Sequence, residues 1–146
     1  MYEITKNKSI TTKIAYGIIG LILLSALLKI LFKEPELTLD QELQEISNMT
    51  NKHTPIQIDS LTTLNNTQAL YGNKLQYNIS INADKANVDT TILVTTSKER
   101  VINMLKTDPK GSYFFTNKID IIYRYTDKTG KYICQIIITP KDLSSQ

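Results

Sequence analysis

The sequence of 146 residues is poor in the residue types that build most catalytic and metal sites. It contains one cysteine, Cys134, and one histidine, His53, so no disulfide can form within the chain and no set of several zinc ligands can be assembled. It has five glycines, and they form no phosphate-binding loop. Paired-carboxylate and nucleotide-binding motifs are also missing. We therefore expect no enzyme, no metal, no cofactor and no small-molecule substrate.

The two residues with reactive side chains have simpler interpretations. A hydrolase would need His53 beside a nucleophile and an orienting acid, and Ser60 with Asp59 is the nearest candidate set. Such residues are common in a turn-rich sequence, so we interpret His53 as a loop histidine. Cys134 lies in an apolar stretch, which favours a buried thiol. An intermolecular disulfide through Cys134 stays open.

The surplus of positive charge that nucleic-acid binding requires is confined to the start of the chain. Residues 1–35 contain five lysines and two glutamates, which accounts for the whole net charge of +3. Residues 36–146 contain twelve basic and twelve acidic side chains. A domain without net positive charge gains little from the release of phosphate counterions. We therefore expect no nucleic-acid partner.

One long apolar run is present. The segment from Ile14 to Leu28 has no charged residue, and the run resumes after Lys29 as Ile30-Leu31-Phe32. This length predicts a single transmembrane helix over residues 14–33 that contacts membrane lipid. Lysines precede it and acidic residues follow it, so residues 1–13 are expected in the cytoplasm and residues 34–146 in the periplasm, at the bacterial inner membrane.

The alternative for this run is a signal peptide that is cleaved. Cleavage needs small residues spaced as Ala-x-Ala, whereas the run offers only Ser25-Ala26, followed by Leu27-Leu28-Lys29. No cysteine lies near residue 26, which excludes lipoprotein processing there. We favour the anchor over the cleaved signal.

The remaining residues predict an α+β domain. Thr38 and Gln41 have the spacing of a capping box, and the apolar stripe that follows predicts a helix. Alternating residues in "KLQYNISIN" predict a strand, and "IDIIYRYT" and "KYICQIIIT" around "DKTG" predict a hairpin. A second helix ends before Pro109, while residues 88–96 suit either a strand or a helix. We expect the order α-β-β-α-β-β, with an antiparallel sheet of about four strands covered by helices.

Three stretches carry a resemblance: "TPIQIDSLTTL", "LQYNI" and "IIYRYTDKTGKYICQIIITPKDL". They resemble a group of small bacterial envelope proteins that pair Tyr-x-Tyr strands around a D-x-x-G turn before a T-P-x-D ending. The resemblance implies an envelope location and an α+β fold, and it implies no biochemical activity. Members of the group often carry a cysteine in the second helix and another after T-P-x-D. Here those regions hold Met104-Leu105-Lys106 and Leu143, so that disulfide is absent.

The tyrosine-rich strands offer the best candidates for a contact with another protein. Aromatic residues and arginine are enriched where proteins recognise one another. The candidates are Tyr77, Tyr123, Arg124, Tyr125 and Tyr132. Cross-strand tyrosine pairs also stabilise sheets without binding anything, and that interpretation stays open.

Together these features favour a membrane-anchored, non-catalytic protein-interaction domain. The leading hypothesis is a subunit or accessory factor of a bacterial envelope assembly, such as a secretion system, whose partners are other envelope proteins. The alternative is an inhibitor of the immunity or superinfection-exclusion type that acts outside the inner membrane.

Overall fold

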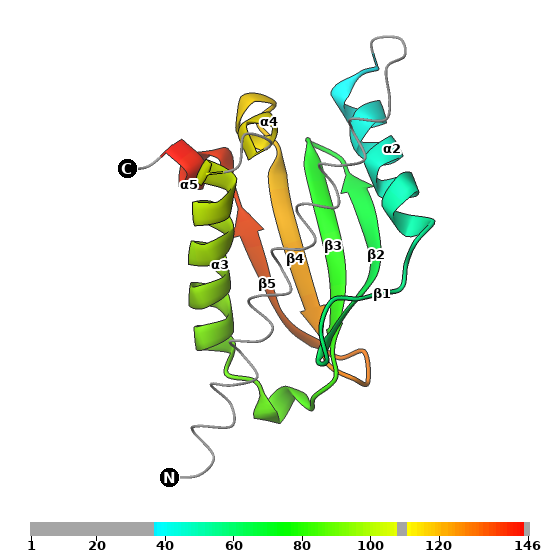
Figure 1. Cartoon of the computed structure of the whole chain (residues 1–146), viewed down its shortest axis with the longest axis vertical. Helices are drawn as coiled ribbons and strands as arrows, with labels where there is room; N and C mark the ends of the chain where they lie inside the picture. Colours follow the sequence, from blue (N-terminus) through cyan, green and yellow to red (C-terminus); the bar gives the residue numbers. More distant parts are fainter. Residues whose placement is uncertain (1–36, 108–110, 145–146) are drawn as a thin grey trace.

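A computed structural model describes residues 37–107 and 111–144 of the chain (Figure 1). In chain order the described elements are α2 (Leu39–Asn51), β1 (Ile56–Gln57), β2 (Thr62–Leu70), β3 (Lys74–Ile81), the 3-10 helix η1 (Lys85–Asn87), α3 (Thr90–Thr107), α4 (Gly111–Thr116), β4 (Asp120–Thr126), β5 (Tyr132–Ile138) and α5 (Pro140–Ser144). They form one five-stranded sheet, with α2 beside β2 and α3 beside β5.

The expected antiparallel sheet of about four strands is wrong in two respects. The sheet has five strands in the order β1-β2-β3-β4-β5, and β3 pairs with β4 in parallel. The additional strand is the short β1, which pairs with β2 through Ile56 and Gln57. The parallel pair follows from the connection, because α3 and α4 carry the chain back along the sheet before β4 begins. The order α-β-β-α-β-β is therefore also corrected.

Local signals determined where both long helices begin. The capping box predicted at α2 is confirmed: the Gln41 N–H donates to Thr38 Oγ1 and the Thr38 N–H donates to Gln41 Oε1, at 3.4 and 2.9 Å. Residues 88–96, which the sequence left undecided, are mostly helical. Asp89 precedes α3 and accepts the Ile92 N–H at 3.0 Å, which satisfies a donor that the first turn leaves unpaired.

The predicted hairpin is present between β4 and β5. Its turn is closed by Asp127, whose Oδ1 accepts the N–H and the hydroxyl of Thr129 and the N–H of Lys131. Gly130 has φ of +83°, a conformation that costs glycine little and other residues more. The pKa of Asp127 is lowered, mainly by the hydrogen bond from the Thr129 hydroxyl. This effect outweighs burial, which by itself would raise the pKa.

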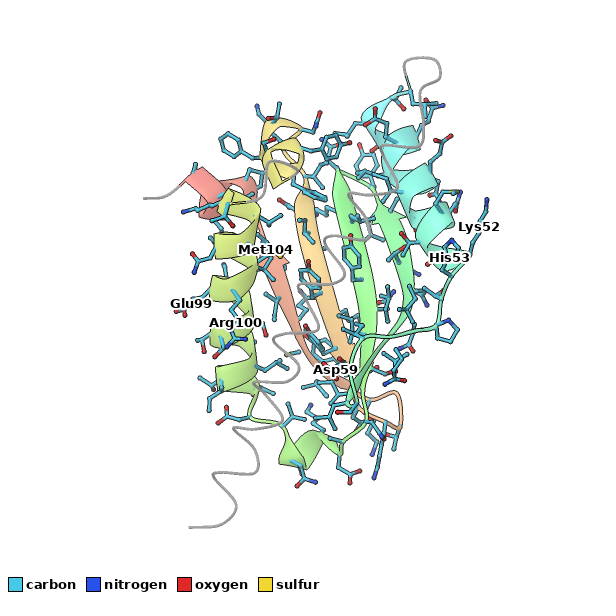
Figure 2. The ribbon with its side chains drawn as sticks, viewed as in Figure 1. Lys52, His53, Asp59, Glu99, Arg100 and Met104 are labelled. Atoms are coloured by element: carbon cyan, nitrogen blue, oxygen red, sulfur yellow. The ribbon has the colours of Figure 1, made fainter. Side chains whose placement is uncertain are left out.

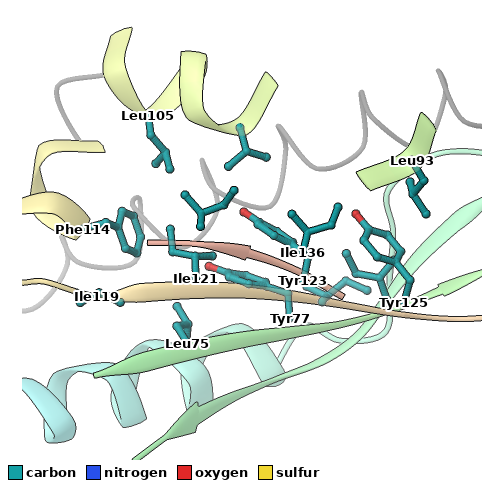
Figure 3. Packing of buried hydrophobic residues seen from close by; sticks show 14 of the residues in the cluster. Leu75, Tyr77, Leu93, Leu105, Phe114, Ile119, Ile121, Tyr123, Tyr125 and Ile136 are labelled. Atoms are coloured by element: carbon teal, nitrogen blue, oxygen red, sulfur yellow. The ribbon is translucent and has the colours of Figure 1, made fainter. Parts of the chain in front are cut away.

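The core lies on one face of the sheet. Tyr77 of β3 and Tyr123 of β4 stand opposite each other in the parallel register, and their rings stack with centroids 5.2 Å apart. Figure 3 shows these rings beside Tyr125 and among Ile121, Ile136 and Leu93. Leu43 and Ile46 from α2 and Val101 and Leu105 from α3 belong to the same buried cluster. Both long helices therefore cover the same face.

Within residues 37–107 and 111–144, no helix has the length and hydropathy that a membrane crossing requires. The transmembrane helix predicted over residues 14–33, and the cytoplasmic tail predicted over residues 1–13, lie outside the described residues.

The short helix α5 is attached to α3 through Asp142. The Lys98 ammonium lies 2.8 Å from Asp142 Oδ1, while Oδ2 accepts the Thr139 N–H and hydroxyl at 2.8 and 2.7 Å. Partial burial by itself would raise the pKa of Asp142. The hydrogen bonds from Lys98 and Thr139 outweigh it and lower the pKa to about 2.

We predict that Asp142→Asn lowers the free energy of unfolding at pH 7 by about 1 kcal/mol, a value discounted for the exposure of Lys98. The carboxylate is ionised in the folded state down to about pH 2, whereas in the unfolded chain it takes up a proton near pH 4. The wild type therefore has the higher free energy of unfolding above about pH 4, and this difference is lost as the pH falls toward 2. Urea unfolding of both proteins between pH 2 and 7 measures this, and a difference that does not depend on pH would contradict it.

Candidate protein-binding site

Three of the five candidate residues lie inside the domain. Tyr77, Tyr123 and Tyr125 are each at most 1% exposed and belong to the core cluster. Burial raises the pKa of the Tyr123 hydroxyl well above its usual value, and the neighbouring Tyr77 and Tyr125 raise it further. The Tyr123 and Tyr125 hydroxyls have no hydrogen-bond partner among the described residues. In this structure the three rings fill the interior and present no surface to a partner.

The other two candidates lie together on the opposite side of the sheet. The Arg124 Cζ lies 5.6 Å from the centre of the Tyr132 ring, within the range of a cation–π contact. Both side chains are exposed, Tyr132 by 46%. The structure therefore divides the five candidates by sheet face, with three tyrosines in the core and one arginine–tyrosine pair on the surface.

A register shift explains why Tyr132 joins Arg124. Simple alternation places Tyr132 on the same face as Cys134, Ile136 and Ile138. The register shifts between Tyr125 and Thr126, so Tyr125 pairs with Cys134 and Thr126 pairs with Tyr132, which leaves Ile133 as an extra residue. Such a bulge turns the side chains beyond it to the other face. Ile133 is buried and Tyr132 is exposed.

The face that carries Arg124, which we call the polar face, is rich in amide side chains. The Asn78 Nδ2 donates to Asn66 Oδ1 at 2.6 Å, and the Gln76 Nε2 donates to Asn78 Oδ1 at 2.9 Å. Arg124 lies next to Asn78 in the parallel register and opposite Gln135 on β5. An exposed Ile137 lies on the same face. This surface offers hydrogen-bond donors and acceptors around the Tyr132 ring and the Arg124 guanidinium.

A second surface, which was not expected from the sequence, lies between α2 and the outer edge of β2. A groove of about 440 Å³ is lined by Gln44, Ser47 and Asn51 of α2 and by residues 66–70 of β2. The Thr67 N–H donates to Asn51 Oδ1 at 2.7 Å, and the Asn51 Nδ2 donates to the Thr67 carbonyl at 2.8 Å. The Ser47 hydroxyl donates to the same carbonyl at 2.9 Å. Only the helical spacing of Ser47 and Asn51 could have suggested this contact.

The reactive side chains considered above lie in different parts of the fold. His53 is exposed just after α2 (Figure 2). The Asp59 Oδ1 accepts the backbone N–H groups of Leu61 and Thr62, as expected for a residue that shapes a turn. Burial raises the pKa of the free, half-buried Cys134 to about 11, so its thiol is protonated at neutral pH. No group of three or more metal-ligating side chains occurs within the described residues.

The domain is similar to solved structures in its fold, at low sequence identity. No family model matches the sequence, and no curated protein matches it. Among solved structures, the pilotin EpsS of the Vibrio vulnificus type 2 secretion system superimposes with a TM-score of 0.59 at 14% identity, covering 74% of this chain and 94% of EpsS. The type II secretion system pilotin AspS of Vibrio cholerae gives a TM-score of 0.52 at 10% identity, covering 71% of this chain and 91% of AspS.

The domain is similar in fold to these two pilotins. A Pseudomonas aeruginosa protein named as secreted is similar too, with a TM-score of 0.57 at 14% identity, covering 72% of this chain and 92% of that protein. At these identities the pilotin likeness concerns the backbone arrangement and carries no residue of this chain into a functional role. The surfaces of the domain must therefore be interpreted from their own side chains.

We predict that Tyr123→Phe leaves the free energy of unfolding unchanged or raises it by up to about 1 kcal/mol, because it removes a buried hydroxyl that has no partner among the described residues. Tyr123→Ala should lower it by about 3–5 kcal/mol through loss of the stacked ring. Arg124→Ala, on the polar face, should change it by less than about 0.5 kcal/mol. Urea unfolding of the three variants checks this, and a large loss in Tyr123→Phe would show that the hydroxyl has a structural partner.

Proposed function

We propose that this protein is an accessory factor of a bacterial secretion assembly and acts by binding other envelope proteins, without catalysis. The observation that carries the proposal is the fold shared with EpsS and AspS, both of which are named as type II secretion system pilotins. The match extends over more than nine tenths of each of those chains. It also covers 74% and 71% of this chain, so it goes beyond a common supersecondary motif.

The location is part of the proposal. The uncharged run from Ile14 to Leu28, with lysines before it and acidic residues after it, supports attachment at the inner membrane with the domain in the periplasm. Attachment would raise the effective concentration of the domain near a membrane-bound partner. It would also fix which sides of the domain a partner can reach.

The polar face is the contact surface that we propose for such a partner. Its exposed Arg124 and Tyr132 are of the types enriched at binding hot spots. Their cation–π contact favours one mutual arrangement of the two side chains, which reduces the side-chain entropy lost on binding. The surrounding amides can satisfy the polar groups that a partner would bury.

The test is co-purification of the full chain from gently solubilised membranes, with mass spectrometry of the proteins that accompany it. We predict stoichiometric recovery of secretion-assembly proteins with the wild type. The double variant Arg124→Ala/Tyr132→Ala should reduce that recovery at least about tenfold. The matched control is Glu99→Ala, which removes an exposed charge from α3 on the other side of the sheet (Figure 2) and should leave recovery unchanged.

Recovery of the chain alone and as a monomer would contradict the accessory-factor proposal and favour the inhibitor alternative. The intact mass of the purified chain tests the location separately. A chain that retains residues 14–33 agrees with the proposed anchor, whereas a mass that lacks them indicates a cleaved signal.

A further inference from the structure

The outer edge of β2 has backbone groups that face away from the sheet. The Thr67 N–H and carbonyl both bind the Asn51 side chain, so they point outward and away from β3. Backbone groups alternate in direction along an antiparallel strand, and β2 pairs with β3 in regular register from Asn66 to Leu70. The N–H and carbonyl of Ala69 therefore point the same way as those of Thr67.

Among the described residues, no strand occupies this part of the edge. Within residues 37–107 and 111–144, the strand paired with the outer side of β2 is β1, and its two residues pair with Thr63 and Leu64. Ala69 is half-buried and lines the edge groove. Unpaired groups on a sheet edge form a template for another extended chain.

Asn51 shows what kind of group fits this edge. Its carboxamide donates one hydrogen bond to Thr67 and accepts one from it, at 2.8 and 2.7 Å. A peptide group of a neighbouring strand offers the same donor and acceptor. The carboxamide therefore occupies the position that the backbone of an added strand would take.

The side chains around the groove restrict the occupant further. None of the residues that line it is charged, and most are amides or hydroxyls, apart from Ala69 and Leu70. Tyr71, directly after β2, is 96% exposed and could pack on one end of a bound segment. The chemistry suits an extended segment that lacks charged side chains at its centre.

We infer that the β2 edge between Asn66 and Leu70 is a strand-addition site for an uncharged, extended segment of the partner protein. The inference rests on the proposed function for the existence of that partner. In the free protein the Asn51 carboxamide and the Ser47 hydroxyl bind the Thr67 backbone. On binding, the partner backbone pairs with Ala69 and displaces the Asn51 carboxamide from Thr67. This recognition mode gives affinity through main-chain hydrogen bonds and selectivity through alternate side chains.

The experiment places a photoreactive residue at the groove in the full chain, in the cells that produce it. With Gln68→p-benzoylphenylalanine, illumination should crosslink the chain to a segment of one of the co-purified proteins, identified by peptide mass spectrometry. Gln135→p-benzoylphenylalanine on β5 is the positional control. It should give a different crosslinked segment, because β5 forms the opposite edge of the sheet.

Backbone variants then test the strand geometry. Ala69→Pro removes the outward N–H and should reduce the crosslink from position 68 at least about tenfold, since it removes the donor and places a ring at the edge. Ala69→Ser keeps the N–H and should stay within about twofold of the parent. Asn51→Ala removes the competing carboxamide and should raise the crosslink yield from position 68. If Asn51 only stabilised the fold, the same variant would lower that yield. Circular dichroism verifies that each variant folds.

Four outcomes would overturn the inference. Equal crosslinking by Ala69→Pro and Ala69→Ser would exclude strand addition. Co-purification of a partner without a crosslink from position 68 would refute the edge site and leave the proposed function standing. A crosslink to a second copy of this chain would assign the edge to self-association. If no protein co-purifies at all, the proposed function fails and the inference fails with it.

Discussion

The parallel pairing of β3 with β4 is the constraint on which the rest of the structure depends. It joins a unit made of α2, β1, β2 and β3 to a hairpin made of β4 and β5, and α3 and α4 form the connection between them. The stacked Tyr77 and Tyr123 rings lie at this junction, one from each half. Without the long crossover, β4 could only have followed β3 as an antiparallel neighbour.

This pairing also determines the two faces of the domain. Once Tyr77 and Tyr123 stand side by side, the alternate residues Asn78 and Arg124 must lie next to each other on the opposite face. Helices α2 and α3 cover the tyrosine side because their apolar stripes need a surface to bury. The polar side is left with amides, one arginine and, through the bulge at Ile133, one exposed tyrosine.

The fold alone does not decide the function. The likeness to pilotins, at 10–14% identity, concerns the backbone arrangement, so the particular side chains of this chain must supply any contacts. The domain offers two surfaces of different character. The polar face presents side chains, as a conventional protein interface does, while the β2 edge presents backbone groups that Asn51 partly satisfies. The two surfaces adjoin at Asn66, whose side chain accepts a hydrogen bond on the polar face and which also lines the groove.

The sequence alone determined the features that depend on neighbouring residues. The capping box of Thr38 and Gln41, the alternation along β3 and the turn at Asp127 and Gly130 all act within a few residues, so they could be read directly. These signals indicated helices and strands, but they did not indicate the mixed sheet into which the strands assemble. Arginine and tyrosine could be named as candidate residue types, although the sequence did not separate surface tyrosines from buried ones.

Tertiary structure decided everything that depends on distant residues. The direction of β4 relative to β3 was set by a crossover whose first residues, rich in Thr, Ile and Val, suit a strand as well as a helix. The bulge that moved Tyr132 beside Arg124 exists only when β4 and β5 pair. The contact between Asn51 and Thr67 spans sixteen positions and needs α2 to dock on the sheet edge. Local pattern carries no information on such pairings, because their energy comes from groups that meet only in the folded chain.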